Sequence, residues 1–419
     1  MSNNKINHEK SNLSLSLSLS NKLIHRKNSL SFTKSTSGFT IVELLVVIVV
    51  IGILAAITIV SYTGITSRAT VAVIQSDLTN ASGQLKIYQA TYGSYPTALT
   101  NNCPSAPTAD NTLCLKSSPN NTYSNYLSNG TTFALTSTNT NGTAYGINDT
   151  SSPVALAGPT DCPTGFIPVP GSATYGQAGF CTMKYAASQV GATNVPVSVP
   201  SVQPWVNISQ TTAIANSPNV ANCTGCHLIT EAEYMTIAQN VLGVASNWSG
   251  GVVGTGYISS GHNDNAPANA LAPDPSDANG NAGETNQTFA QKRTLTLSNG
   301  QVIWDMAGNV WEWTSGTSTT GQPGVAGNAY ASWIQWPNVT TPGTLSPNVF
   351  PSGTGITGSG AWTSTQGIGQ LLSNPAEASL HGFVRGGDWN YGSNAGVLTL
   401  SLRNSPSAAI SGIGFRVSR

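Results

Sequence analysis

An almost entirely apolar run from Ile41 to Val60 constrains this chain more than any other feature. Glu43 is the only charged residue among its twenty positions. A helix of this length is about 30 Å long, which matches the hydrocarbon core of a membrane. A carboxylate in such a helix is costly unless a cation neutralises it. We therefore expect a membrane-spanning helix in which Glu43 has a partner.

The residues before this run form a basic, serine-rich leader that ends at Gly38. A secretory signal places its small cleavage residues after its apolar region. Here the order is reversed, which indicates that the apolar helix survives processing. Gly38, Phe39 and Glu43 at this spacing resemble the class III signal of type IV pilins.

The pilin resemblance implies that a prepilin peptidase cuts between Gly38 and Phe39 and that the new N-terminus is methylated. It also implies that Glu43 meets the N-terminal amine of a neighbouring pilin subunit as the helices assemble. The alternative is a plain membrane anchor with Glu43 near the interface.

Charge and composition indicate an exported surface protein. Charged residues make up only 8% of the 419 residues, whereas Gly, Ser, Thr and Asn are abundant. Six of the 16 basic residues and one of the 16 acidic residues lie in the leader, which leaves the rest of the chain near −5. This argues against nucleic acid as a partner. The basic leader favours the cytoplasmic side of the membrane. We expect a single-pass protein of the inner (cytoplasmic) membrane that later becomes part of an extracellular pilus or the cell surface.

Six cysteines in close pairs predict three disulfides in an exported protein. Pairing by proximity gives Cys103–Cys114, Cys162–Cys181 and Cys223–Cys226, although fifteen connectivities are formally possible. Cys223, Cys226 and His227 also match the c-type haem attachment pattern. We favour the disulfide and expect no haem, because a haem would need room in a packed domain and a distal ligand.

Four segments follow from the patterns along the chain. They are a prepilin leader (1–38), a membrane or filament helix (39–66), a pilin-like head (67–158) and a second domain (159–419). The helical pattern continues from Arg68 to about Tyr92 and is then broken by a turn. Strand-like pieces at 121–127, 131–138 and 143–149 predict a small antiparallel head, which would end in a Pro/Gly-rich linker.

The second domain is expected to be α+β and rich in loops. Thr230 and Glu233 predict a capping box at the start of a helix that stops near Gly243. Residues 245–290 are rich in Gly, Asn and Asp and predict long loops, and strand-like alternation returns after them.

Four separated motifs in this domain resemble the formylglycine-generating-enzyme (sulfatase-modifying-factor) domain, a variant of the C-type-lectin fold. They are HLITEAEYMTIA, IWDMAGNVWEWT, VRGGDW and the terminal GFRVSR. The resemblance implies an α+β fold with few regular elements. Four tryptophans in or beside these motifs are expected to be core residues: Trp304, Trp311, Trp313 and Trp389.

This domain lacks the metal-binding residues of the enzymes that it resembles. Formylglycine-generating enzymes have a copper-binding cysteine pair near the C-terminus, but no cysteine lies beyond Cys226. His227, His262 and His381 do not match the three-His iron site of the related sulfoxide synthases. We therefore predict a protein that is not an enzyme. The alternative is a surface enzyme of the sulfatase-modifying-factor superfamily.

The C-terminal segment resembles the variable region of lectin-like proteins that are targets of diversity-generating retroelements, with RGG and GFR framing it. Tyr, Arg, Asn and Ser together provide rigid contact area and adaptable hydrogen bonds. The predicted ligand contacts are Asp388, Asn390, Tyr391, Ser393, Asn394, Ser401, Arg403, Asn404 and Ser411. The alternative is an ordinary Ser/Asn-rich loop.

Structural calcium is a further implication of the family resemblance. The matching positions are Asp305, Gly308, Val310 and Glu312, which offer carboxylate and carbonyl oxygens on a tight turn. The alternative is that the two carboxylates cap turns. A second ion at Asp274 or Asp277 is a weaker expectation.

These features together predict a minor or tip subunit of a type IV pilin-like assembly that presents a ligand-binding domain. The expected partners are other pilin subunits, prepilin peptidase, the membrane and an unknown extracellular ligand. A pseudopilin of a secretion or DNA-uptake system remains an alternative.

Overall fold

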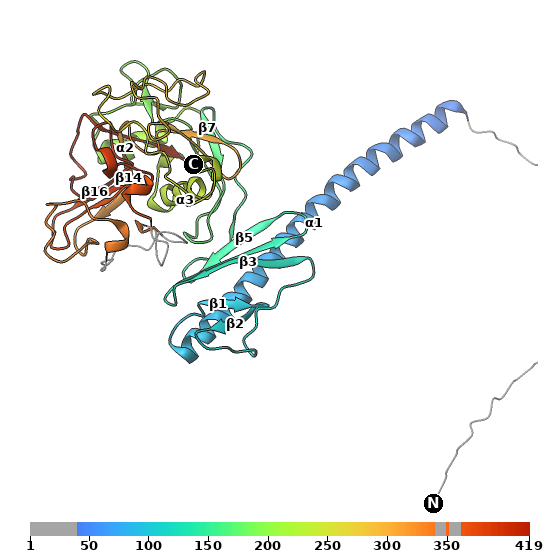
Figure 1. The fold of residues 1–419 in the computed structure, drawn as a ribbon. Helices are drawn as coiled ribbons and strands as arrows, with labels where there is room; N and C mark the ends of the chain where they lie inside the picture. Colours follow the sequence, from blue (N-terminus) through green and yellow to red (C-terminus); the bar gives the residue numbers. More distant parts are fainter. Residues whose placement is uncertain (1–39, 340–348, 352–361) are drawn as a thin grey trace, which may run out of the picture. The chain divides into compact units, whose positions relative to one another are not determined.

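The computed structural model describes residues 40–339, 349–351 and 362–419 (Figure 1). Gly38 and Phe39 of the predicted cleavage site lie outside these residues. The chain divides into two compact units, Met1–Gly64 and Ile65–Arg419. Helix α1 (Ile41–Tyr92) begins in the first unit and ends in the second, as the sequence predicts. It is the one described helix that is long and apolar enough to cross a membrane, judged by length and composition.

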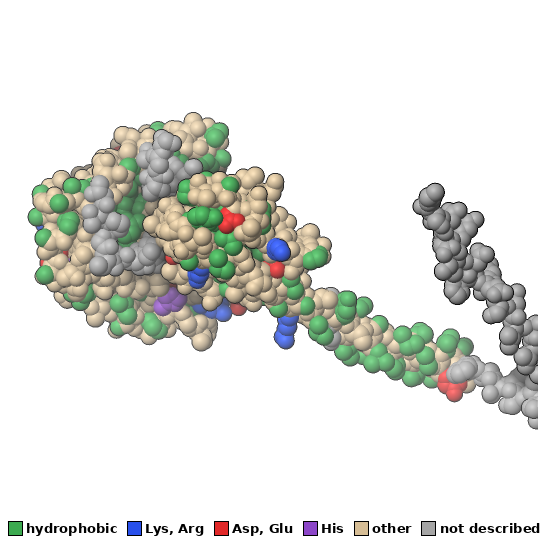
Figure 2. All heavy atoms as spheres, turned by 90° about the horizontal axis from the view of Figure 1, so that it is seen from below, with side chains coloured by type: hydrophobic (Ala, Val, Ile, Leu, Met, Phe, Trp, Pro, Cys, Tyr) green, Lys and Arg blue, Asp and Glu red, His purple; other side chains and the backbone are tan. Residues whose placement is uncertain are grey.

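The first part of α1 presents apolar side chains on all its sides. Nearly all large hydrophobic residues from Ile41 to Ile65 are exposed, and Figure 2 shows hydrophobic side chains along this stretch. A helix that is apolar all round is stable only when it is surrounded by lipid or by other apolar helices. At its start, Thr40 and Glu43 form a reciprocal cap: the Thr40 N–H and hydroxyl both donate to Glu43 Oε2 at 2.9 Å.

The second part of α1 forms the core of the predicted head. Ile74, Leu78 and Leu85 recur at helical spacing and are fully buried. They pack against aromatic and aliphatic side chains of the head strands. The strands are a hairpin of β1 (Ala98–Thr100) and β2 (Cys103–Ala106), and an antiparallel sheet of β3 (Asn121–Ser128), β4 (Phe133–Asn139), β5 (Ala144–Asn148) and β6 (Val154–Ala155). This confirms the three strands that the sequence predicts.

One buried carboxylate ties the helix to the head. Asp77 of α1 accepts hydrogen bonds from the Ser118 N–H (2.9 Å), the Ser118 hydroxyl (2.8 Å) and the Asn121 amide (2.7 Å). Three donors satisfy this buried charge without a salt bridge. The predicted linker after the head is partly structured, because β6 pairs with β5 within it.

Two sheets bring the family motifs together in the second domain. A five-stranded sheet has the order β15-β17-β16-β14-β18, and a four-stranded sheet has the order β11-β19-β8-β7. Strand β14, from the WEWT motif, lies between β16, which ends in the RGG motif, and β18 of the GFR motif. The strands are β7 (Phe166–Val169), β8 (Phe180–Met183), β11 (His227–Leu228), β14 (Trp311–Ser318), β15 (Leu371–Leu372), β16 (His381–Arg385), β17 (Leu400–Ser401), β18 (Ile413–Phe415) and β19 (Val417–Ser418).

The other elements of this domain are short. Helix α2 spans Gln210–Asn216, and two small hairpins pair β9 (Ser188–Gln189) with β10 (Pro196–Val197) and β12 (Thr294–Thr296) with β13 (Val302–Trp304). Helix α3 (Glu231–Leu242) has the predicted capping box and ends at Gly243. Between Asn247 and Thr294 the chain forms loops, as predicted.

The tryptophan core is largely as expected from the sequence. Trp304, Trp311 and Trp313 are buried, and Trp248 joins them as a fully buried residue. Trp389 is only half-buried, so its assignment to the core was wrong. It follows the RGG motif at the point where the chain leaves the sheet, and this turn places the ring near the surface.

Candidate ligand-binding surface

Three buried arginine–carboxylate pairs hold the family motifs in place. Arg385 of the RGG motif pairs with Glu231 in the first turn of α3. Arg416 of the GFR motif pairs with Glu312 of β14, at 2.7 Å. All the side chains in these pairs are at most 7% exposed. Each arginine also donates to main-chain carbonyl oxygens, so the buried charge is both neutralised and hydrogen-bonded.

The third pair occupies the turn that the sequence assigns to calcium. Arg293 donates to both oxygens of Asp305, at 2.8 and 2.7 Å. Glu312 is likewise held by a guanidinium, while Gly308 donates its N–H to Gly386 and Val310 is buried. A calcium ion needs these carboxylate oxygens and would lie beside two cations. The arrangement does not fit an ion at this turn, and calcium binding stays a prediction for chelation experiments.

The weaker calcium candidates, Asp274 and Asp277, close turns instead. One Asp274 oxygen accepts hydrogen bonds from the N–H and hydroxyl of Ser276, at 2.9 and 2.7 Å. Asp277 accepts from the N–H groups of Asn279 and Asn281. The two carboxylates therefore act locally as turn caps.

The predicted variable segment lies mostly at the surface, between the strands that carry the RGG and GFR motifs. Seven of its nine predicted ligand residues are exposed or half-exposed: Asn390, Tyr391, Ser393, Asn394, Arg403, Asn404 and Ser411. The other two are corrections because both are buried: Ser401, which lies in β17 opposite Val384, is 5% exposed, and Asp388 is 7% exposed. The segment thus contains a buried strand between two exposed stretches.

The structure brings the two ends of this segment together. A side chain at Gly412 would contact both Asp388 and Trp389, so Ser411 and the residues after the RGG motif are neighbours. Asn404 lies elsewhere, because its carbonyl accepts the N–H of Gly382 near the start of β16. Ser411 and the residues that follow the RGG motif therefore form the main candidate surface.

An aromatic cluster supports this surface. The Trp311 ring stacks on the Trp333 ring at 6.1 Å between centroids, and Tyr391 meets both edge-on at 4.9 and 5.8 Å. Trp333 and Tyr391 are half-buried, so part of each ring remains accessible. Such rings offer rigid contact area with little loss of side-chain freedom on binding. Trp333 was not predicted as a site residue, because it lies outside the family motifs.

Two titratable groups on this surface are perturbed by burial. Asp388 is 7% exposed, and burial raises its pKa to about 6 despite the hydrogen bond from the Asn390 N–H. Burial also raises the pKa of Tyr391, and the nearby Asp388 carboxylate adds to that shift. At neutral pH the surface thus carries one poorly solvated carboxylate beside a neutral phenol.

All six cysteines form the predicted disulfides: Cys103–Cys114, Cys162–Cys181 and Cys223–Cys226. The two thiols of the haem-like pattern are therefore joined to each other. The adjoining His227 instead lies 3.0 Å from Glu233, and this hydrogen bond raises the pKa of His227 above its usual value.

Comparison with known families matches both ends of the chain. Residues 33–59 match the prokaryotic N-terminal methylation motif, and residues 173–419 match the sulfatase-modifying factor enzyme 1-like domain. Because the second match covers more than half of the chain, this protein belongs to the sulfatase-modifying factor enzyme 1-like family. The two matches confirm the resemblances to pilins and to this domain family. No curated protein matches the chain.

Among solved structures, the chain is similar to the Major Tropism Determinant M1 variant, with 14% identity and a TM-score of 0.32 over 63% of this chain and 54% of that chain. It is also similar to Treponema denticola variable protein 1, with 13% identity and a TM-score of 0.27 over 72% of this chain and 99% of that chain. The chain thus spans about half the length of the Major Tropism Determinant chains that it matches.

Proposed function

We propose that this protein is a minor or tip subunit of a type IV pilin-like assembly that displays a non-catalytic ligand-binding domain outside the cell. The observation that carries the proposal is that one chain contains both a pilin-type N-terminus and a sulfatase-modifying factor enzyme 1-like domain. An N-terminal methylation motif leads into an exposed apolar helix, and a family domain follows it. Before assembly the helix spans the inner membrane, and afterwards it packs among the helices of other pilin subunits.

Two features of the second domain support a binding role. Three carboxylates of the family motifs, Glu231, Asp305 and Glu312, are each held by an arginine, so these three are not free for acid–base chemistry. Its cysteines are all in disulfides, which leaves no thiol to bind copper. The accessible chemistry lies instead on the C-terminal surface, among Asn, Ser and Tyr side chains.

Assembly is tested with the full chain in a host that makes type IV pili. We expect the wild type in sheared filaments with its leader removed after Gly38. Gly38→Ala should leave an uncut chain in the inner membrane. Glu43→Val should be cut but should not enter filaments. A wild-type chain that is processed but never found in sheared filaments would favour a pseudopilin instead.

Binding is tested with the purified full chain on a glycan array and on intact cells of other bacteria. Asn390→Ala and Tyr391→Ala should each lower binding at least tenfold, whereas Asn279→Ala, an exposed change outside the segment, should not. Equal loss in all three variants would refute a site at the C-terminal surface. Stoichiometric copper or iron with substrate turnover would favour the alternative of an enzyme.

Diversification of the segment is a separate part of the proposal. It predicts a reverse transcriptase and an adenine-rich template repeat in the flanking DNA. Their absence would remove diversification and leave the binding surface standing.

A further inference from the structure

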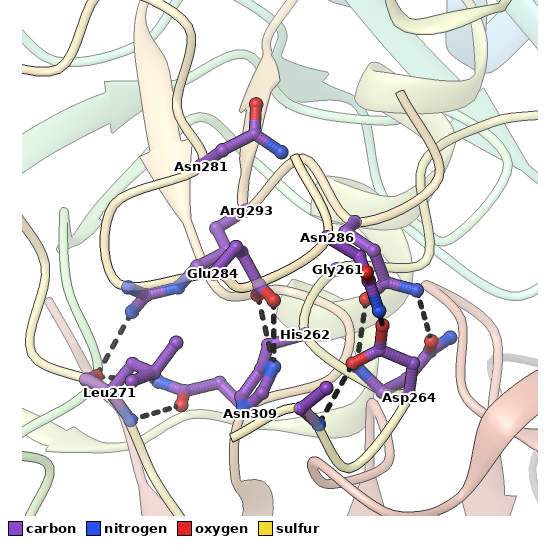
Figure 3. A network of polar contacts seen from close by, with 12 residues as sticks. Gly261, His262, Asp264, Leu271, Asn281, Glu284, Asn286, Arg293 and Asn309 are labelled. Atoms are coloured by element: carbon purple, nitrogen blue, oxygen red, sulfur yellow. Dashed lines mark hydrogen bonds and ion pairs between the residues drawn. The ribbon is translucent and has the colours of Figure 1, made fainter. Parts of the chain in front are cut away.

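Three side chains of types that can ligate metal ions meet in the long loop region beside the C-terminal surface. A ring nitrogen of His262 and carboxylate oxygens of Asp264 and Glu284 all lie within 4.8 Å of one another (Figure 3). His262 is fully buried and Glu284 is 5% exposed, whereas Asp264 is half-exposed. Neither the family motifs nor the predicted calcium turn includes these residues.

The hydrogen bonds of the His262 ring require a positive charge between the ring and Glu284. Nε2 lies 3.0 Å from the Asn269 carbonyl oxygen, which only accepts, so Nε2 carries a hydrogen. In a neutral ring Nδ1 then has a lone pair, and this lone pair faces both Glu284 oxygens at 3.0 and 3.1 Å. Two lone pairs at that distance repel unless a proton or a metal ion joins them.

The carboxylate of Glu284 can accept a further hydrogen bond or bind a metal ion. No donor is aligned on its Oε1 atom, although the side chain is completely buried, and an unsatisfied buried oxygen is rare. Nitrogen and oxygen ligands that are each about 2.1 Å from one metal ion stand about 3.0 Å apart at octahedral angles and about 3.4 Å apart at tetrahedral angles. The spacing of Nδ1 and Oε1 therefore fits ligation as well as a hydrogen bond.

The surroundings resemble those of metal-binding histidines and carboxylates. A ligating histidine usually donates its other N–H to a carbonyl or carboxylate, as Nε2 does to Asn269. Asp264 is oriented by the Ala266 N–H at 3.0 Å and the Asn286 amide at 2.6 Å, which leave lone pairs on both its oxygens. Its partial exposure provides an entry path and room for water ligands.

The charges nearby favour a cation. Two acidic side chains, Asp264 and Glu284, lie beside His262. A third, Asp388, is close enough for a charged His262 to lower its pKa. Arg293 is the basic group that acts on His262, but its guanidinium is already paired with both oxygens of Asp305. One further positive charge would be attracted by the remaining carboxylates.

We propose that His262, Asp264 and Glu284 bind a divalent transition-metal ion, of the Zn²⁺ or Mn²⁺ class, that fixes the loop supporting the C-terminal surface. A nitrogen ligand with two carboxylates suits these ions better than Ca²⁺, which prefers oxygen ligands alone. The loop is bonded directly to that surface: the Asn265 N–H donates to the Trp389 carbonyl at 2.6 Å, and the Gly392 N–H donates to the Asn263 carbonyl at 2.9 Å.

The test uses the full chain, purified in detergent without a histidine tag and stripped with a chelator. Zn²⁺, Mn²⁺ or Ca²⁺ is then added, and bound metal is measured by plasma mass spectrometry after gel filtration. We expect one equivalent of Zn²⁺ or Mn²⁺ per chain. At a concentration 100 times the Kd, the Tm should rise by about 5 °C or more. Any Ca²⁺ that the chain retains should be unaffected by His262→Gln, because this site prefers ions that accept a nitrogen ligand.

Variants separate a metal site from a buried His–Glu ion pair. His262→Gln and Glu284→Gln should bind no metal, and the half-exposed Asp264→Asn should bind at least tenfold more weakly while remaining folded. His227→Gln, at another His–Glu pair of this domain, is the matched control and should bind as the wild type does. The proposal is overturned if the stripped wild type takes up no stoichiometric Zn²⁺ or Mn²⁺, or if Asp264→Asn and His262→Gln bind them undiminished.

Discussion

Replacing Arg416 by methionine tests whether the GFR motif is a structural anchor. The Arg416 side chain is completely buried and donates four hydrogen bonds. Two go to the oxygens of Glu312, at 3.1 and 2.7 Å. The other two go to the carbonyls of Met183 (2.7 Å) and Trp304 (2.8 Å). Methionine has a similar length and no charge, so the substitution removes the donors while filling much of the space.

The expected loss of stability is large because Glu312 would be left buried and unpaired. Breaking a buried ion pair from one side costs about 3–5 kcal/mol. Each of the two orphaned carbonyls adds about 1 kcal/mol unless water reaches it. For a domain of this size, 1 kcal/mol corresponds to about 2–4 °C in Tm. We therefore expect Arg416→Met to lower the Tm by roughly 10 °C or more.

Tryptophan fluorescence of the full chain in detergent measures this loss. All nine tryptophans lie between Trp205 and Trp389, so the signal reports on the second domain alone. The loss should depend on pH, because an unpaired buried Glu312 would have a folded-state pKa above its unfolded value. The folded variant then binds more protons than the unfolded chain, and its stability falls by about 1.4 kcal/mol per pH unit between those two pKa values.

Two controls make the result decisive. Arg419 lies three residues after Arg416 and forms an exposed ion pair with Asp161. Arg419→Met should lower the free energy of unfolding by less than about 0.5 kcal/mol. Adding Glu312→Gln to Arg416→Met should abolish the extra pH dependence. A loss below 1 kcal/mol in Arg416→Met, or a loss that is the same at pH 5 and pH 8, would refute the argument.

Four further outcomes follow from the structure. Asp388→Asn should stabilise the domain by roughly 2 kcal/mol above pH 6 and have little effect below pH 4, because the burial that raises the pKa of Asp388 to about 6 penalises only its charged form; Tm against pH checks this. Thr230→Ala should cost about 1 kcal/mol through loss of the α3 cap, with Thr230→Ser as the neutral control in urea unfolding. Leu400→Ala should cost about 2–5 kcal/mol, whereas Asn390→Ala should stay within 0.5 kcal/mol in the same unfolding assay. Gly38→Ala should keep the leader attached, which intact-mass measurement would show.

Sequence reasoning was accurate where structure is decided locally. The helix to Tyr92, the capping box at Thr230 and the head strands depend on periodicity, caps and turns within a few residues. The disulfides could also be predicted from local sequence, because each joins cysteines at most 19 residues apart. The family motifs identified the second domain without revealing what their residues do.

The rest of the site depends on contacts that no local pattern encodes. Arg385 meets Glu231 across 154 residues, and Arg416 meets Glu312 across 104. Nothing in the sequence pairs these particular charges, and the family resemblance alone led to the prediction that Glu312 is a calcium ligand. Ser401 was assigned to the surface because it lies in the segment that resembles a variable region, and the two-residue strand β17 is too short to show alternation.

The positions of the arginines explain how the exposed residues of the C-terminal segment could be substituted while the fold persists. Arg385 and Arg416 lie on either side of the C-terminal segment, and each is tied to a carboxylate outside it. Strands β16 and β18 both pair with β14, so the segment between them starts and ends at fixed points. Within it, the fully buried Leu400 and its neighbours fill the core, whereas the exposed residues contribute little to it. Substitution at the exposed positions therefore alters what the surface presents without touching the pairs that hold its frame.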